Sequence, residues 1–221
     1  MRLFLATSSL DDIRWGVDAG LIDGVVATPT VIATEAPQAD TREVVAEILR
    51  AIRLPVCASV PAVTSADLVK GARDLAKLGE HVIVAVPLIE DALPAIRRLS
   101  GDGIAVAATL VHSVAQGILA AHAGATMVTV SVDALDAVGE DGARVVALLR
   151  QAFVRTDVEC DVAAAGPASA ASFATCAAAG TDVAIVTPAV LRGLLQHPLT
   201  DRGLDRFLGA ISRRPKPKRA R

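Results

Sequence analysis

Short, mostly apolar runs alternate with longer amphipathic segments along the whole chain. Eight such runs can be identified, at residues 2–6, 24–27, 54–60, 81–86, 103–110, 125–132, 158–165 and 182–187. They are rich in Val, Ile and Ala, and several are apolar on both faces. Strands with helices on both sides show this composition, whereas half-exposed strands alternate apolar and polar residues. The pattern therefore predicts eight buried, parallel strands.

The segments between these runs carry helix signals. In segment 41–52, a single stripe is formed by Val44, Val45, Ile48 and Leu49. Three further segments repeat this spacing: 65–79, 113–125 and 168–180. Each ends at or near a glycine, which is common at helix C-termini, so Gly79 is expected to end the second of them. At the start of the chain, Ser9 followed by Asp12 resembles a capping box before another helix.

Eight strand–helix units joined by short connections favour an α/β fold of the closed (β/α)8, or TIM barrel, type. The alternative is an open, doubly wound sheet. That fold usually has fewer strands and a glycine-rich phosphate turn, and the sequence contains neither GxGxxG nor GxxxxGK[ST]. We therefore expect one barrel domain over residues 1–212.

After the last unit, the stretch 197–211 predicts a further, ninth helix that Thr200 and Asp201 can cap. Its apolar stripe comprises Leu204, Phe207, Leu208 and Ile211. This helix is surplus to the barrel, so we expect its stripe to pack on a neighbouring subunit.

Composition separates the body of the chain from its C-terminus. The chain has 221 residues and a net charge of −2, but residues 213–221 hold six basic and no acidic residues. Without those six, 16 basic residues face 24 acidic ones, a net charge of −8. We expect a disordered basic tail at 213–221 and an acidic body that does not bind nucleic acid, except weakly through that tail.

Three further features concern location and redox state. No apolar run approaches the roughly 18 residues of a membrane span, and the N-terminus turns acidic too soon for a signal peptide. The cysteines Cys57, Cys160 and Cys176 are far apart and odd in number. We interpret them as reduced core residues of a cytoplasmic protein.

Four stretches together resemble the small transaldolases and fructose-6-phosphate aldolases: residues 21–35, 74–87, 108–125 and 197–207. The similarity extends over residues 2–211 with the same spacing between landmarks. It implies a (β/α)8 barrel, an extra C-terminal helix that packs on a neighbouring subunit, and a homo-oligomer, commonly a decamer of two five-membered rings. The implied chemistry is class I aldol transfer, in which a lysine on the fourth strand forms an imine with a ketose.

The chain departs from this family at the positions that carry the chemistry. Ala85 replaces the Schiff-base lysine in "IVAVP". The other catalytic positions hold Ala6 for an aspartate, Thr28 for an asparagine, Ser59 for a glutamate or glutamine, Ala107 for an asparagine, and Thr109, which matches the family. On the sixth strand, Ser131 replaces an aromatic residue. At the phosphate positions, Ala134 replaces an arginine, Ala165 a serine and Pro167 a basic residue.

No other lysine is placed to take over the imine. Lys70 and Lys77 belong to a helix outside the predicted barrel, and Lys216 and Lys218 belong to the tail. An alanine cannot form an imine, and the phosphate clamp is missing as well. The residues that build the scaffold nevertheless fit the family. This combination predicts a fold that has been kept while the aldolase chemistry has been lost.

The polar groups expected at the carboxyl ends of the strands are mostly hydroxyls. The ligand-binding candidates are Thr28, Ser59, Thr109, Thr129, Ser131 and Asp133, and Thr7, Thr30 and Thr187 are also expected there. No His, Cys, Asp or Glu residues show metal-ligand spacing, so no metal or cofactor is expected. His112 is interpreted as a capping or solvated residue, and His81 and His197 as structural.

Two functions follow, and the sequence leaves both open. The first is a non-catalytic transaldolase-like barrel that binds a partner or small molecule, or acts as a scaffold. The second is an enzyme with a different, non-imine reaction on a less charged small molecule, because Ala and Val at formerly polar positions would enlarge and dry the pocket. In either case the name transaldolase would describe ancestry.

Overall fold

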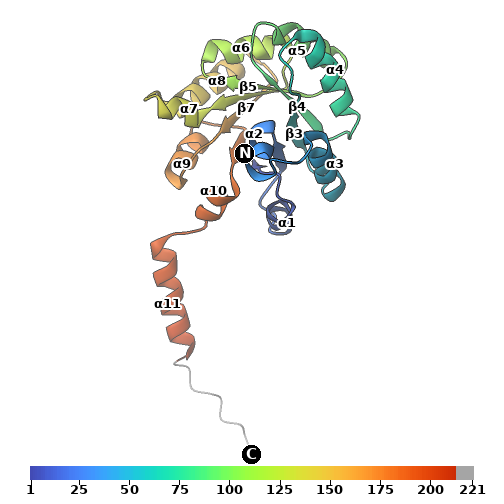
Figure 1. The fold of residues 1–221 in the computed structure, drawn as a ribbon. Coiled ribbons are helices and arrows are strands. Elements are labelled where there is room, and N and C mark those ends of the chain that lie inside the picture. Colours follow the sequence, from blue (N-terminus) through green and yellow to red (C-terminus); the bar gives the residue numbers. More distant parts are fainter. Residues whose placement is uncertain (213–221) are drawn as a thin grey trace, which may run out of the picture.

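A computed structural model describes residues 1–212 and shows a closed barrel of parallel strands surrounded by helices (Figure 1). The strands are β1 (Arg2–Ala6), β2 (Gly24–Ala27), β3 (Val56–Ser59), β4 (Val82–Pro87), β5 (Val106–Val111), β6 (Met127–Ser131), β7 (Asp161–Ala165) and β8 (Val183–Val186). Neighbours pair in chain order, and β1 pairs with β8 to close the ring. The predicted (β/α)8 barrel is confirmed.

Helices follow the strands and cover the outside of the barrel (Figure 1). They are α1 (Leu10–Asp18), α2 (Pro29–Glu35), α3 (Thr41–Ala51), α4 (Ser65–Ala76), α5 (Ala92–Gly101), α6 (Val114–Ala123), α7 (Val132–Ala137), α8 (Gly142–Thr156), α9 (Ala170–Ala178), α10 (Pro188–Gly193) and α11 (Pro198–Ser212). On α3, the middle of the predicted stripe faces the core, because Val45 and Ile48 are fully buried.

The helix C-termini agree in part with those predicted from the sequence. Gly124 ends α6 in a left-handed conformation with φ 106°, as the pattern predicts. The expectation for Gly79 is wrong: α4 ends at Ala76, and Lys77 is its C-cap. Two i→i+3 bonds tighten the chain there instead, from Leu78 N to Leu75 O at 3.0 Å and from Gly79 N to Ala76 O at 3.4 Å.

The N-terminal caps also differ in detail from those expected. The Ser9 hydroxyl accepts a hydrogen bond from Asp12 N at 3.3 Å, which is one half of a capping box. A complete box occurs at α9, where Ser169 and Ser172 each bind the backbone N–H of the other.

The predicted ninth helix is present as α11, but it begins earlier than expected. It starts at Pro198, a residue favoured in the first turn, and Leu199 N donates to His197 Nδ1 at 3.1 Å. Thr200 and Asp201 therefore lie inside the helix and do not cap it. Figure 1 shows α11 standing away from the barrel. The predicted tail at 213–221 lies outside the described residues.

The core has two layers, one between strands and helices and one inside the barrel. The inner layer comprises Phe4, Val26, Cys57, Ala85, Ala107, Met127, Ala163, Val183 and Ile185. Phe4 fills the largest share of it, and this requires a glycine on the next strand. A Cβ at Gly24 would lie 2.6 Å from the Phe4 ring. Within residues 1–212, no helix is long and apolar enough to cross a membrane.

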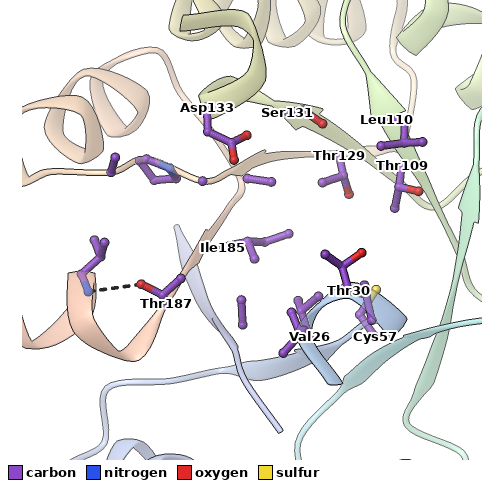
Figure 2. Close-up of a pocket in the computed structure, with 18 residues that line it drawn as sticks. Val26, Thr30, Cys57, Thr109, Leu110, Thr129, Ser131, Asp133, Ile185 and Thr187 are labelled. Carbon is purple, nitrogen blue, oxygen red and sulfur yellow. Dashed lines mark hydrogen bonds between the residues drawn. The ribbon is translucent and has the colours of Figure 1, made fainter. Parts of the chain in front are cut away.

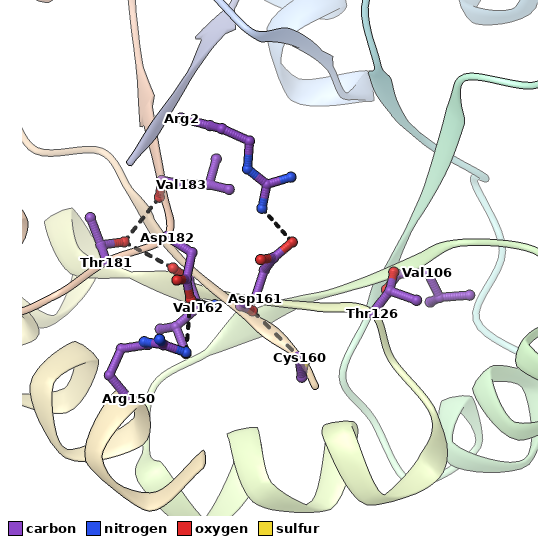
Figure 3. Close-up of polar contacts among 10 residues, drawn as sticks. All are labelled: Arg2, Val106, Thr126, Arg150, Cys160, Asp161, Val162, Thr181, Asp182 and Val183. Atoms are coloured by element: carbon purple, nitrogen blue, oxygen red, sulfur yellow. Dashed lines mark hydrogen bonds and ion pairs between the residues drawn. The ribbon is translucent and has the colours of Figure 1, made fainter. Parts of the chain in front are cut away.

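Polar contacts hold together the face of the barrel where the strands begin (Figure 3). Arg2 on β1 pairs with Asp161 on β7. Asp182 accepts a hydrogen bond from Val162 N at 2.8 Å and pairs with Arg150 on α8 at 3.3 Å. The buried Thr181 hydroxyl lies 2.9 Å from Val162 O and 3.0 Å from Val183 O. These contacts support stability, and function in barrels belongs to the opposite face.

Candidate functional site

A cavity of about 560 Å³ opens at the carboxyl ends of the strands (Figure 2). Small-molecule sites commonly have this size and position in barrels. Its walls and floor are mainly apolar and include Ala6, Val26, Cys57, Leu110, Ala165, Pro167, Ile185 and Val190. The hydroxyls and the single carboxylate in the lining come from Thr28, Thr30, Thr109, Thr129, Ser131, Thr187 and Asp133.

Five of the six ligand-binding candidates therefore line one cavity, and Ser59 does not. Ser59 is the last residue of β3 and borders a separate hollow at the start of α3 and beside α4. The strand places Cys57, two residues earlier, in the cavity instead. Thr7 is also outside: it is fully buried, and its hydroxyl lies 3.0 and 2.9 Å from the two carboxylate oxygens of Glu35.

Ala85 lies at the position where the family resemblance expects the imine-forming lysine. Its side chain is fully buried in the inner layer, beside Ala107 on β5 in the strand register and opposite Ser59 on β3. Ala85 and Ala107 are both fully buried, and neither lines the cavity. The cavity lies over β5–β8 and β1–β3, and no residue of β4 lines it.

Of the positions that the family resemblance assigns to phosphate binding, the structure places only some in the cavity lining. Ala165 and Pro167 line the cavity beside Gly166, but Ala134 does not. Instead, the backbone N–H of Ala134 donates to Asp133 Oδ1 at 2.9 Å. The Asp133 side chain packs over Gly166, whose φ is +80°, and a Cβ at that glycine would come within 2.4 Å of Asp133 Cγ. Gly166 thus allows the carboxylate to lie over the end of β7.

The charge of the lining differs from that of the phosphate site that the family resemblance implies. Among the described residues that line the cavity there is no Lys, Arg or His. Lys70 and Lys77 border a different hollow on the outside of the barrel, at α4 and α5. Burial raises the pKa of the Cys57 thiol to about 12, so this group is neutral at physiological pH. Among the described residues that line the cavity, Asp133 is the one with a charged side chain.

Two features of the site have no counterpart in the sequence analysis. The Thr129 hydroxyl is buried and has no hydrogen-bond partner among the described residues. Leu110, at a register shift of β5, has φ 58° and is 56% exposed at the cavity rim. A bulge redirects side chains at a strand end, and here it lies directly after Thr109.

His112 and Gln116 act at the start of α6. The backbone N–H of His112 donates to Gln116 Oε1 at 2.8 Å, and Gln116 N donates to the Ser113 hydroxyl at 3.2 Å. These contacts hold the first turn of α6 in place. His112 is not part of the cavity lining. Within residues 1–212, no group of three or more His, Cys, Asp or Glu residues is arranged to hold a metal ion.

Comparison with known proteins places these findings in context. The family model described as transaldolase/fructose-6-phosphate aldolase matches residues 3–215. A probable transaldolase of Kosmotoga olearia is 38% identical over 208 residues, covering 94% of both chains. One from Bacteroides fragilis is 39% identical over 210 residues, covering 94% of this chain and 96% of the other.

A solved structure supports the fold alone. It is a cube-shaped, highly porous protein cage designed by fusing symmetric oligomeric domains, and it matches with a TM-score of 0.64 at 15% sequence identity. The match covers 96% of this chain and 77% of the other.

Proposed function

The chain belongs to the transaldolase/fructose-6-phosphate aldolase family, and we propose that it has lost the imine chemistry of class I aldolases and acts as a non-catalytic binding or scaffolding barrel. The observation that carries this proposal is Ala85, a fully buried methyl group at the lysine position. Class I chemistry requires an amine whose pKa is lowered so that it attacks a carbonyl at neutral pH. The described cavity lining contains no amine.

The loss extends beyond the nucleophile. A proton-transfer group is needed as well, and the aspartate position holds Ala6. Sugar phosphates are bound through cations, but Ala134 and Pro167 occupy the basic positions. Asp133 would also repel a phosphate electrostatically at the cavity. Restoring one residue would therefore leave the reaction without its acid–base group and its phosphate site.

Borohydride trapping tests this proposal directly. The full-length protein is incubated with dihydroxyacetone or fructose 6-phosphate, reduced with borohydride, and weighed by intact mass spectrometry. We expect no adduct, while an active class I aldolase treated in parallel gains the mass of the reduced substrate. An adduct that peptide mapping assigns to Lys70 or Lys77 would overturn the proposal.

A second candidate function is an enzyme with a non-imine reaction on a less charged small molecule. The apolar walls and the hydroxyl lining favour it, because they suit a substrate that carries few charges. A small molecule converted by the wild-type protein and not by variants of the cavity lining would favour this candidate over the binding protein.

We also propose a homo-oligomer assembled through α11, a pentamer or decamer as the family resemblance implies. The support is the exposure of Leu204, Phe207, Leu208 and Ile211, each between 50% and 61%. Apolar surface of this extent on a single helix is uncommon in a monomer.

A further inference from the structure

The Thr129 hydroxyl is the most unusual polar group of the cavity. Thr129 lies on β6 and is 6% exposed, and its Oγ1 has no partner among the described residues. Figure 2 shows this hydroxyl directed into the space enclosed by the lining side chains. A buried polar group without a partner is unfavourable, and native structures avoid it unless a ligand or water supplies the missing bond. Thr129 therefore marks a ligand contact inside the cavity.

Asp133 determines the charge that the ligand carries. Among the described residues, its carboxylate accepts one hydrogen bond, at Oδ1 from Ala134 N, and Figure 2 shows the carboxylate directed toward the cavity. No basic residue lies in the described lining to neutralise it. An anionic ligand would be repelled, whereas a cation would form a charge-assisted hydrogen bond.

From these observations we infer that the cavity binds a small amine with an apolar body. The protonated nitrogen pairs with Asp133, and a second polar group of the ligand forms a hydrogen bond with the Thr129 hydroxyl. The body packs on the apolar floor around Val26, Cys57 and Ile185. This inference rests on the proposed function, because it takes the site to be free of imine chemistry.

Two other ligand classes fit the lining less well. A metal ion would need several carboxylate, thiolate or imidazole ligands, and no such group occurs in residues 1–212. The raised pKa of Cys57 also keeps its thiol from acting as a thiolate ligand. A polyol would leave Asp133 without a cation and would meet apolar walls on most sides.

Three related probes separate the contributions of the amine and the hydroxyl. Tyramine carries both groups on an aromatic body, phenethylamine lacks the hydroxyl, and 3-(4-hydroxyphenyl)propionate replaces the amine by a carboxylate. Affinities are measured on the full-length protein by saturation-transfer NMR titration, which works at any oligomeric size. We expect tyramine to bind about tenfold or more tightly than the propionate and several-fold more tightly than phenethylamine.

Two variants assign these differences to residues. In Asp133→Asn, which keeps the acceptor for Ala134 N, we expect tyramine to lose about tenfold in affinity. In Thr129→Val, which keeps the shape of the side chain, tyramine is expected to bind no better than phenethylamine. Asp91→Asn is the control: Asp91 precedes α5, has no side-chain cap bond and does not line the cavity. Tyramine binding to it is expected to match the wild type.

The opposite results would overturn the inference. They are binding of the propionate as tight as that of tyramine, no binding of tyramine at millimolar concentration, or unchanged affinity in Asp133→Asn. None of these outcomes bears on the borohydride experiment. A borohydride adduct with fructose 6-phosphate would contradict the proposed function. A titration in which tyramine does not bind would contradict only the inferred amine ligand.

Discussion

Thr129 and Thr181 are buried threonines with opposite hydrogen-bond states, which makes them a matched pair. Thr129 has no partner in the described structure, whereas the Thr181 hydroxyl contacts two backbone carbonyls. We predict that Thr129→Val raises the free energy of unfolding by about 1 kcal/mol, because an unpaired buried hydroxyl is removed. Thr181→Val is expected to lower it by about the same amount or more. Urea unfolding of both variants without ligand measures the difference, and destabilisation by Thr129→Val would mean that the hydroxyl is bonded.

Because of Cys57, the free energy of unfolding is expected to decrease as the pH rises through the alkaline range. Its pKa is about 12 in the folded chain because of burial, against 9.0 for an exposed thiol. Above pH 9 the unfolded chain loses this proton and the folded chain keeps it, so the stabilisation present below pH 9 decreases as the pH rises.

The expected loss from this thiol is about 1.4 kcal/mol per pH unit between roughly pH 10 and 12. Urea unfolding at pH 8 and pH 10.5 measures it in the wild type and in Cys57→Ala. The gap between the two proteins is expected to shrink at the higher pH, since other titrating groups are common to both. A gap that stays constant would show that the thiol ionises in the folded chain as easily as in the unfolded one.

At this scale the sequence identifies residue types but not their partners. It placed Thr28, Thr109, Thr129, Ser131 and Asp133 at the strand ends, and the cavity contains all five. It could not show that Thr129 lacks a partner or that Thr7 binds Glu35, because both depend on distances across the fold. Ser59 was misplaced because the end of its strand borders the hollow beside α4.

Among the elements, β5 has the least regular geometry. Leu110 adopts a left-handed conformation at the register shift, a position that costs a residue with a Cβ roughly 1–2 kcal/mol. We predict that Leu110→Gly is more stable than Leu110→Ala by about 1 kcal/mol, because glycine adopts this conformation freely.

The exposed Leu119 on α6 provides the control. There the order reverses, and glycine is expected to be less stable than alanine by about 1 kcal/mol. Thermal or urea unfolding of the four variants compares the two sites. The same order at both positions would contradict a strained Leu110.

The sequence predicts strands most accurately where they are buried on both faces, because the apolar run is then continuous. The runs at 2–6 and 24–27 coincide with β1 and β2, whereas the run at 54–60 extends beyond β3 at both ends. Apolar composition cannot separate a strand from the half-buried loop residues beside it. The bulge at Leu110 was missed for a related reason, since no glycine marks it.

At the scale of the whole molecule, the two ends of the barrel have opposite character. The face where strands begin is closed by ion pairs and bonded threonines, and the opposite face holds a largely apolar cavity with an unpaired hydroxyl. The scaffold is therefore stabilised independently of the site. This separation agrees with the proposed function, in which the catalytic groups that the family resemblance implies are replaced by alanine, threonine and proline without loss of the fold.

The proposed assembly depends on α11, whose apolar face contacts little of its own barrel. Leu204 and Leu208 are one turn apart and are 54% and 53% exposed. We predict that Leu204→Glu combined with Leu208→Glu shifts the protein from an oligomer to a monomer, because two charges would have to be buried at the interface. Arg202→Glu, on the same helix outside that stripe, is expected to leave the assembly intact.

Light scattering after size-exclusion chromatography gives the mass of each variant, and circular dichroism checks the fold of the monomer. A wild-type protein that already runs as a monomer would contradict the proposed assembly, and a double variant that keeps the wild-type mass would place the interface elsewhere.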